Sequence, residues 1–242
     1  MNKPFPFADY RRARNSLERA LRDADNTYLL LTGESGTGKT ALLHELTAAL
    51  DRYRYRPLYF AHARQLAPTG LIRVLARNLR VHTGRSHAET VHALVTHLHE
   101  EPLQLWIGFD EAHELPQETL TEVRTLAESD LGGHTHLRIL FCGLPALRQR
   151  LQAMPSIWRR IVVREEITSL TRDEIAPFLV HHFGKTTCQR FADDALAVCF
   201  ERGRAIPGHI LPAVRAVLHA APAKGTIQPT FVEELLERWN LP

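Results

Sequence analysis

The sequence contains little cysteine. Its 242 residues include three, Cys142, Cys188 and Cys199, and no two of them form a C-x-x-C pair. This pattern excludes a disulfide framework and a zinc site built on paired cysteines, and it is typical of a reducing compartment. The sequence also lacks the apolar N-terminal segment of a signal peptide, and its apolar runs are far shorter than the roughly 18 residues of a membrane helix. We therefore expect a cytoplasmic protein with no membrane contact.

Metal-binding and DNA-reading motifs are also missing. The chain has 14 histidines, but those at 82–99 recur at steps of about five residues, which drift around a helix, and no H-E-x-x-H motif occurs. Scattered surface histidines are the better interpretation. No helix-turn-helix or zinc-finger motif is evident, and the net charge of +3 is too small to identify a nucleic-acid binder. Any DNA binding should therefore be largely independent of base sequence.

Apolar and amphipathic segments alternate over the first 168 residues. An amphipathic helix over Ala8–Arg22 precedes an apolar strand, and further helical patterns separate the strands that follow. We predict five strands, at residues 28–32, 56–61, 103–110, 137–143 and 161–167. The run at 103–110 is uniformly apolar up to its final acid, as expected of a central parallel strand buried on both faces. The alternation predicts an α/β core with a doubly wound parallel sheet over residues 1–168.

The pattern changes after this core. From Thr171 onward only helices are predicted, at 171–183, 191–202, 207–221 and 230–239. Two of them begin with a capping box, formed by Thr171 with Glu174 and by Thr230 with Glu233. We therefore predict a second domain over residues 169–242, a small helical lid.

A phosphate-loop motif, G-x-x-x-x-G-K-[ST], follows the first predicted strand and opens a predicted helix. Glycines let the loop curl so that its backbone N–H groups point inward at phosphates. The lysine reaches the β- and γ-phosphates of ATP, and the hydroxyl of the last residue ligates Mg²⁺. The candidate nucleotide-binding residues are Thr32, Gly33, Glu34, Ser35, Gly36, Thr37, Gly38, Lys39 and Thr40.

A pair of acids ends the buried strand at 103–110. Asp110 and Glu111 are placed by this strand at the carboxyl edge of the sheet, where the phosphates are expected. Asp110 would hold Mg²⁺ through water, and Glu111 would orient and polarise the water that attacks the γ-phosphorus. Because an acid at the second position separates triphosphate hydrolases from proteins that only bind the nucleotide, we predict an ATPase.

The domain order narrows the class of ATPase. The sequence DEAH at 110–113 is typical of helicases, but these need a second α/β domain, whereas this tail is helical. No LSGGQ-like signature supports an ABC protein, and a nucleotide kinase would explain neither Glu111 nor the helical tail. A sheet followed by a helical lid is the AAA+ arrangement, in which ATP lies at a subunit boundary and an arginine of the neighbour completes the site.

Several segments resemble one group within that class. The segments LLLTGESGTGKTALL, FDEAHEL, LRILFCGLPALRQRL and WRRIVVREEITSLTRDEIAPFL resemble, in this order, the ExeA-like AAA+ ATPases and their relatives that assist DNA transposition, of the TniB, TnsC and MuB type. The resemblance covers nearly the whole chain, and the G-x-P-x-L run at 143–147 is the part most specific to this group. It implies a homo-oligomer, a ring or a helical filament, in which Arg159 or Arg160 is the arginine finger.

Two positions depart from this family pattern. The polar γ-phosphate sensor expected beside Gly143 is replaced by Cys142 and Leu144. Where the lid arginine is expected the chain has Gly208, for which Arg204 or His209 would substitute. We therefore predict a slow ATPase, or one whose rate depends on assembly or on a partner.

The use of the ATP remains open among three functions. The first is regulation of DNA transposition, with ATP-dependent self-assembly on double-stranded DNA that recruits a transposase or a related recombination protein. The second is the secretion-associated role of ExeA, and the third is a switch for another partner in phage defence or replication. We favour the first, because the membrane and wall-binding segments of the secretion proteins are not seen.

Three arginines on a predicted helix are the candidate DNA contacts. Arg73, Arg77 and Arg80 follow i, i+4, i+7 spacing and so would share one helical face. An oligomer would repeat this face into a stripe that tracks phosphates. A merely solvated helix face is the equal alternative.

Overall fold

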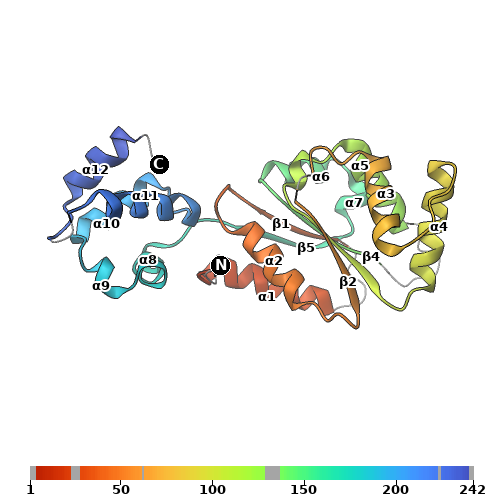
Figure 1. Ribbon diagram of the computed structural model, residues 1–242, viewed down its shortest axis with the longest axis horizontal. Helices are drawn as coiled ribbons and strands as arrows, with labels where there is room; N and C mark the ends of the chain where they lie inside the picture. Colours follow the sequence, from red (N-terminus) through yellow and green to blue (C-terminus); the bar gives the residue numbers. More distant parts are fainter. Residues whose placement is uncertain (1–3, 23–27, 62, 129–136, 223–224, 240–242) are drawn as a thin grey trace. The chain divides into compact units, whose positions relative to one another are not determined.

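The computed structural model describes residues 4–22, 28–61, 63–128, 137–222 and 225–239 (Figure 1). These residues form two compact units. The core unit comprises the described residues of 13–33 and 39–166. The lid unit comprises those of 1–12, 34–38 and 167–242, and so includes the tip of the phosphate loop.

The core unit is built on a five-stranded sheet with the strand order β2-β3-β4-β1-β5. The strands are β1 (Tyr28–Gly33), β2 (Tyr55–Phe60), β3 (Gln104–Phe109), β4 (Leu137–Gly143) and β5 (Ile161–Ile167). Each lies within one residue of the bounds predicted from the sequence. The register pairs Thr32 with Gly143 and Phe60 with Phe109, and the pairs β1–β4, β3–β4 and β2–β3 are all parallel.

The burial of each strand reflects its place in the sheet. All residues of β1 and β4 are buried, as expected of central parallel strands covered on both faces. In β2, at the edge of the sheet, Tyr55 alone is fully buried among the six residues of the strand. Mostly apolar sequences are therefore found where the sheet has two covered faces, and Arg138 of β4 is a buried charged exception.

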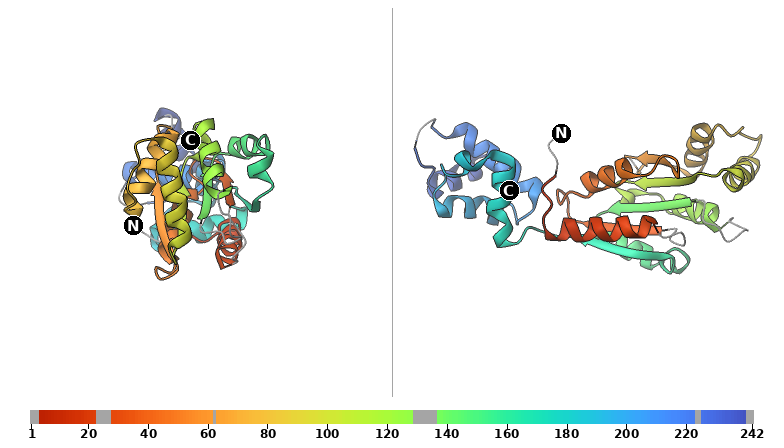
Figure 2. Two further views of the ribbon diagram at one scale, coloured as in Figure 1. Left: turned by 90° about the vertical axis from the view of Figure 1, so that its right-hand side faces the viewer. Right: turned by 90° about the horizontal axis from the view of Figure 1, so that it is seen from below.

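Helices cover both faces of this sheet, as Figures 1 and 2 show. The helices of the core are α1 (Ala8–Arg22), α2 (Lys39–Ala49), α3 (Pro68–Leu79), α4 (His87–Glu100), η1 (Ala112–Glu114), α5 (Gln117–Glu128), α6 (Ala146–Gln152) and α7 (Pro155–Trp158), and α1 begins in the lid unit. Apolar residues of α3 to α7 pack on one face in a single cluster with Ile107, Ile139 and Phe141.

The opposite face is covered by α2. The indole Nε1 of Trp106 donates a hydrogen bond of 3.3 Å to Thr47 Oγ1 in α2, and a Cβ added to Gly108 would lie 2.7 Å from Leu43 of the same helix. The absence of a side chain at Gly108 therefore lets α2 approach β3 closely. This fixes the helix that starts at Lys39 against the strand that leads to Asp110.

The lid unit is helical after residue 167. Its elements are η2 (Arg172–Glu174), α8 (Ile175–Phe183), α9 (Lys185–Cys188), α10 (Asp193–Arg202), α11 (Pro207–Ala220) and α12 (Pro229–Arg238). The capping box predicted for Thr171 and Glu174 is confirmed. The one predicted for Thr230 and Glu233 is wrong, because α12 begins two residues earlier, with Gln228 as its N-cap and Pro229 at its first position. Proline is favoured there, since its fixed φ suits the first helical turn.

The N-terminal residues pack within the lid unit. The ring of Phe5 lies 5.7 Å from that of Phe178 in α8, and the carboxylate of Glu174 accepts a hydrogen bond of 2.6 Å from the backbone N–H of Ala8. Asp9 accepts a hydrogen bond of 3.1 Å from the backbone N–H of Thr168. Residues 4–12 are therefore part of the lid unit, whereas the sequence analysis placed them in the core and began the lid at residue 169.

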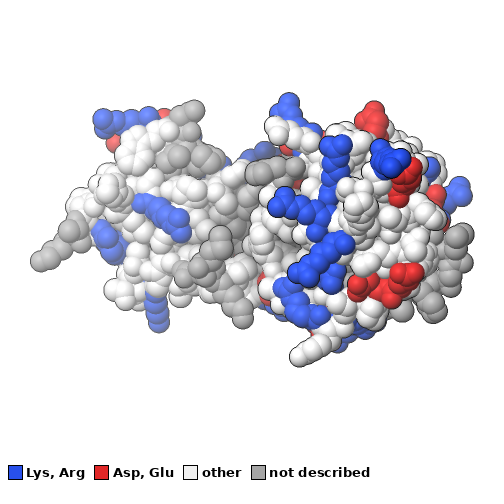
Figure 3. All heavy atoms as spheres, turned by 45° about the vertical axis from the view of Figure 1, so that its right-hand side comes forward, with Lys and Arg blue, Asp and Glu red and all other residues white. Residues whose placement is uncertain are grey.

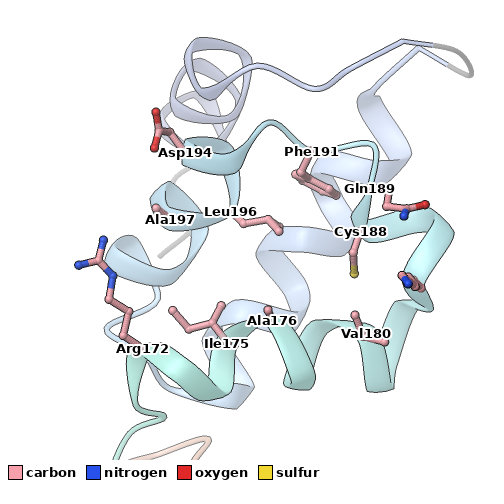
Figure 4. Close-up of a pocket in the computed structure, with 11 residues that line it drawn as sticks. Arg172, Ile175, Ala176, Val180, Cys188, Gln189, Phe191, Asp194, Leu196 and Ala197 are labelled. Carbon is pink, nitrogen blue, oxygen red and sulfur yellow. The ribbon is translucent and has the colours of Figure 1, made fainter.

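A groove of about 690 Å³ lies between α8 and α10 of the lid unit (Figure 4). Ile175, Ala176 and Val180 line it from α8, and Leu196 and Ala197 line it from α10. None of its described lining residues comes from the phosphate loop.

Among the helices that the structure describes, none is long and apolar enough to cross a membrane.

Candidate nucleotide-binding site

The carboxyl ends of four core strands meet at one edge of the sheet. Gly33 ends β1, Asp110 follows β3, Gly143 ends β4, and β2 ends beside β3 at Phe60. Because the paired strands are parallel, their carboxyl ends face the same edge, where open α/β sheets bind ligands. The acid pair and the start of α2 are thereby brought together.

The phosphate loop has a backbone that only glycine adopts readily. Gly36 and Gly38 have φ angles of 83° and 101°, in the left-handed region. Within the loop tip, the backbone N–H and the hydroxyl of Thr37 both donate to the carbonyl of Glu34, at 3.3 and 2.9 Å. Ser35, which lies between Glu34 and Thr37 in the sequence, is exposed. These features match the curled loop predicted from the motif.

Lys39 is buried at the start of α2. Its side chain is 5% exposed, and its Nζ donates a hydrogen bond of 2.8 Å to the carbonyl of Gly33. Thr32, one residue earlier, is buried too, and its hydroxyl lies 3.4 Å from the carbonyl of Glu165 in β5. The ammonium of Lys39 is thus held at the start of α2, beside the carboxyl end of β1.

Asp110 is held by three hydrogen-bond donors. Its Oδ2 accepts from the hydroxyl of Thr40 at 2.8 Å and from that of Tyr59 at 3.0 Å, and its Oδ1 accepts from the backbone N–H of Glu111 at 3.0 Å. The side chain is 4% exposed, so these donors replace the water that a carboxylate requires. Thr40 and Asp110, 70 residues apart in sequence, therefore form one polar cluster.

The pair Thr40 and Asp110 fits Mg²⁺. A hydroxyl and a carboxylate oxygen are hard ligands of the kind that this cation prefers. The Thr40 hydroxyl, which donates its hydrogen to Asp110 at 2.8 Å, keeps a lone pair that would bind the cation, and Asp110 would hold the cation through water.

Tyr59 is a site residue that the sequence analysis missed. Burial and, next, the negative charge of Asp110 raise the pKa of Tyr59 above its ordinary value, so the phenol stays protonated and donates to Asp110. Its segment was predicted as a strand, but the sequence gives no order of strands. Only the pairing of β2 with β3 places Tyr59 beside the acid.

Glu111 has an unusual backbone conformation. Its φ of 49° and ψ of 37° lie in the left-handed region, which costs a non-glycine residue energy and is often found at functional sites. Its side chain is 45% exposed, and its Oε2 lies 3.3 Å from the Nδ1 of His113. The turn thus carries Glu111 out of the sheet edge while Asp110 stays buried.

The two arginine-finger candidates differ in their surroundings. Arg160 forms an ion pair of 2.8 Å with Glu128 at the end of α5. The side chain of Arg159 is exposed. Both lie between the end of α7 and the start of β5.

The lid unit places Gly208, rather than an arginine, against the loop tip. The backbone N–H of Gly208 donates a hydrogen bond of 2.9 Å to the carbonyl of Gly36. A Cβ on Gly208 would lie only 2.6 Å from the Cα of Gly36, so a side chain does not fit in this arrangement. Arg204 is exposed, with a φ of 51°, while His209 is half-buried and its Nδ1 has no hydrogen-bond partner among the described residues.

The three candidate DNA-binding arginines do not share one helix face. Arg73 and Arg77 are exposed on α3, but the helix ends at Leu79, and Arg80 is its C-cap with φ 58° and ψ 31°. A hydrogen bond of 2.8 Å from the N–H of Val81 to the carbonyl of Ala76 closes this helix end. The shared face predicted for all three is therefore wrong for Arg80. Figure 3 shows Lys and Arg side chains in a band across one face of the core unit.

Comparisons with known proteins agree with this architecture. No curated protein matches the sequence. Among solved structures, the chain is similar to the ORC2 protein of Aeropyrum pernix in its ADPNP-ADP complexes (17% identity, TM-score 0.66), covering 98% of this chain and 70% of that one. It is also similar to the ORC1 protein of the same organism in complex with DNA, with 18% identity and a TM-score of 0.62, and the match covers 98% of this chain and 65% of that one. A third similar structure is the Holliday junction branch migration motor RuvB of Thermotoga maritima, with 15% identity and a TM-score of 0.59, and the match covers 98% of this chain and 72% of that one.

These similarities support the fold class predicted from the sequence, a parallel P-loop sheet with flanking helices and a helical lid. The chain spans about two thirds of the length of these solved proteins. A family model described as an AAA domain matches residues 22–151, from the approach to β1 through the end of α6. Because this match covers more than half of the 242 residues, the chain belongs to the AAA domain family.

Proposed function

We propose that this protein is an ATPase that binds ATP together with Mg²⁺ and hydrolyses it to ADP and phosphate. The observation that carries the proposal is the cluster at the sheet edge, in which Thr40 and Asp110 share a hydrogen bond of 2.8 Å beside Glu111. A family that binds nucleotides and an intact phosphate-loop motif support it.

Each residue has a distinct role in this proposal. Loop N–H groups and the ammonium of Lys39 bind the phosphates. Thr40 and Asp110 hold Mg²⁺, which, when bound, neutralises negative charge on the phosphates. Glu111 orients a water molecule and accepts its proton as the water attacks the γ-phosphorus. Its exposed carboxylate is accessible to water, whereas the buried Asp110 is not.

Two substitutions test these roles separately. Lys39→Ala should weaken binding of a fluorescent ATP analogue about 100-fold, because a charge-assisted contact with the phosphates is lost. Glu111→Gln should keep the affinity within about threefold and lower kcat by 10²–10⁴-fold, because the amide accepts no proton. Glu114→Gln, on an exposed side chain of the same turn, is the matched control and should leave both quantities unchanged. Equal loss of binding in the first two variants would contradict the assignment.

We further propose that the protein forms a homo-oligomer on double-stranded DNA in an ATP-dependent way and regulates a transposase or a related recombination protein. The resemblance of its motifs to the TniB, TnsC and MuB group supports this use. Exposed Arg73 and Arg77 on α3 offer a basic surface for phosphates. A secretion-associated role, or a switch in phage defence or replication, is the alternative.

Gel mobility and filament imaging with duplex DNA distinguish these uses. A slowly hydrolysed ATP analogue should promote assembly on DNA at low salt, with little dependence on base sequence. The double variant Arg73→Ala and Arg77→Ala should weaken binding and reduce its salt dependence by about two charges. Its control, Arg19→Ala with Arg22→Ala, removes the same charge from exposed positions at the end of α1. No ATP-dependent assembly on DNA at low salt would favour the alternative.

A further inference from the structure

One ring nitrogen of His113 faces two different partners. His113 lies in η1, directly after the acid pair, and its Nδ1 is 3.3 Å from Glu111 Oε2 and 3.4 Å from the backbone nitrogen of Leu144. The side chain of His113 is 18% exposed. Leu144 follows the last residue of β4, where the γ-phosphate sensor of the resembled family is expected. A single atom thus stands between the proposed catalytic carboxylate and the end of a central strand.

The two contacts need opposite states of Nδ1. The N–H of Leu144 can donate only to an Nδ1 that has a lone pair. The carboxylate of Glu111 can only accept, so it needs an Nδ1 that carries hydrogen. A neutral imidazole supplies one or the other, with the proton on Nε2 or on Nδ1. His113 therefore bonds to the strand end or to the carboxylate, but not to both.

The described residues show the first of these arrangements. The N–H of Leu144 is directed at Nδ1 as a hydrogen bond, whereas Glu111 approaches the same nitrogen without one. In this arrangement Nδ1 is the acceptor, and the carboxylate of Glu111 is left exposed to solvent. A small displacement of Leu144 would release Nδ1 for Glu111.

The backbone around His113 is held by hydrogen bonds, and this restricts where its ring can lie. The guanidinium of Arg150 in α6 donates to the carbonyl of His113 and, at 2.8 Å, to that of Leu115. The ring packs against Gly143, where an added Cβ would lie 3.2 Å from Nδ1. Movement at the end of β4 therefore reaches the histidine directly.

We propose that His113 is a positioning residue for Glu111: it orients the carboxylate through Nδ1–H once the N–H of Leu144 withdraws, and so couples the end of β4 to hydrolysis. This inference rests on the proposed ATPase function. Leu144 has no polar side chain that could contact the γ-phosphate. Its backbone N–H, through the hydrogen bond to His113, would instead link the position of the end of β4 to the orientation of Glu111. The number of protons on the ring does not change: one is released to water at Nε2 as another is taken up from water at Nδ1.

Three substitutions of His113 test which ring nitrogen matters. Asparagine places an amide oxygen or nitrogen close to the position of Nδ1, and an amide flip supplies either an acceptor or a donor there. Glutamine places its amide near Nε2 instead and leaves the Nδ1 position without a polar atom. Alanine removes both. All three leave the backbone carbonyl that Arg150 binds, so the turn is preserved.

The expected result is a difference in kcat without a difference in ATP binding. His113→Gln and His113→Ala should lower kcat at least tenfold, and His113→Asn should stay within about threefold of the natural protein. All three should keep the affinity for a fluorescent ATP analogue and the midpoint of thermal unfolding. Equal kcat in the Asn and Gln variants, or an Ala variant as fast as the natural protein, would overturn the proposal.

A spectroscopic measurement on the intact chain gives an independent test. The ¹⁵N chemical shifts of labelled histidine distinguish a ring nitrogen with a lone pair from one that carries hydrogen. For His113, assigned through the Asn variant, Nδ1 should have a lone pair in the nucleotide-free protein and carry hydrogen with a slowly hydrolysed ATP analogue. The same tautomer in both states would contradict the coupling. An intact protein that binds but never hydrolyses ATP would instead disprove the proposed function, because no kcat would exist to modulate.

Discussion

Replacing Tyr59 by phenylalanine should destabilise the protein by removing one hydrogen bond to a buried carboxylate. In the natural protein, Asp110 has three donors, and the phenol of Tyr59 supplies one of them at 3.0 Å. Phenylalanine keeps the ring, and therefore its contact with His44 at 4.6 Å, but it cannot donate. The carboxylate is 4% exposed, so water has little access to it.

The size of the effect follows from the charge and the exposure. A hydrogen bond to a charged group contributes about 1.5–3 kcal/mol. Tyr59 is only half-buried, so water can take part of the place of its hydroxyl. We therefore expect a loss of about 1–1.5 kcal/mol in the free energy of unfolding, which lowers Tm by about 2–6 °C for a chain of this size.

Thermal and urea unfolding followed by circular dichroism measure this loss. The control is Tyr53→Phe, the same chemical change at a side chain that is 94% exposed, for which we expect no measurable effect. If the two variants unfold alike, the hydrogen bond to Asp110 contributes nothing and the account of the cluster is wrong.

The same pair of proteins has a predicted pH dependence. Because the pKa of Tyr59 is raised above the ordinary value of 10.0, the unfolded chain loses this proton at a lower pH than the folded one. The contribution of Tyr59 is therefore complete below pH 10 and decreases as the pH rises further. The stability difference between the natural protein and Tyr59→Phe should narrow above pH 10. A difference that widens there would refute the assigned direction.

Two further changes test the lid contact and the arginine finger. Gly208→Ala should lower stability by about 1–3 kcal/mol, since its Cβ would lie 2.6 Å from the Cα of Gly36, whereas Gly70→Ala, in an open helical position, should raise it by about 0.5–1 kcal/mol. Unfolding midpoints of the two alanine variants compare these effects, and a neutral Gly208→Ala would mean that the contact is dispensable. Arg159→Ala should lower the ATPase rate of the assembled protein about 10³-fold. Arg160→Ala, whose side chain is already paired, should lower it less than tenfold, and the reverse order would exchange the two roles.

Long apolar segments made most of the fold predictable. The strands β1, β3 and β4 lie within one residue of their expected positions because each is a buried run between clear breaks, and the shorter apolar stretches of β2 and β5 at the sheet edges were enough to place those strands as closely. The four-residue helices α7 and α9 were missed, since a single turn has no periodicity to detect. The left-handed cap at Arg80, which ends α3 after Leu79, was not foreseen, because arginine seldom adopts this conformation.

The candidate site was predictable only in part. The phosphate loop and the acid pair follow from motifs whose chemistry demands particular residues at a fixed spacing. Tyr59 and His113 could not be assigned, because their roles depend on which strands are neighbours and on the direction of a single ring nitrogen. The glycine at 208 was taken for a missing arginine, whereas the structure shows two backbones in close approach.

The hydrogen bond between Trp106 and Thr47 gives the protein an intrinsic optical probe. The indole is fully buried in β3, and its partner belongs to the helix that starts at Lys39. Any shift of that helix when a ligand occupies the loop would change the polarity around the indole and hence the wavelength of its emission maximum. With Trp158 and Trp239 replaced by phenylalanine, tryptophan fluorescence would follow loop occupancy in real time, with no label attached.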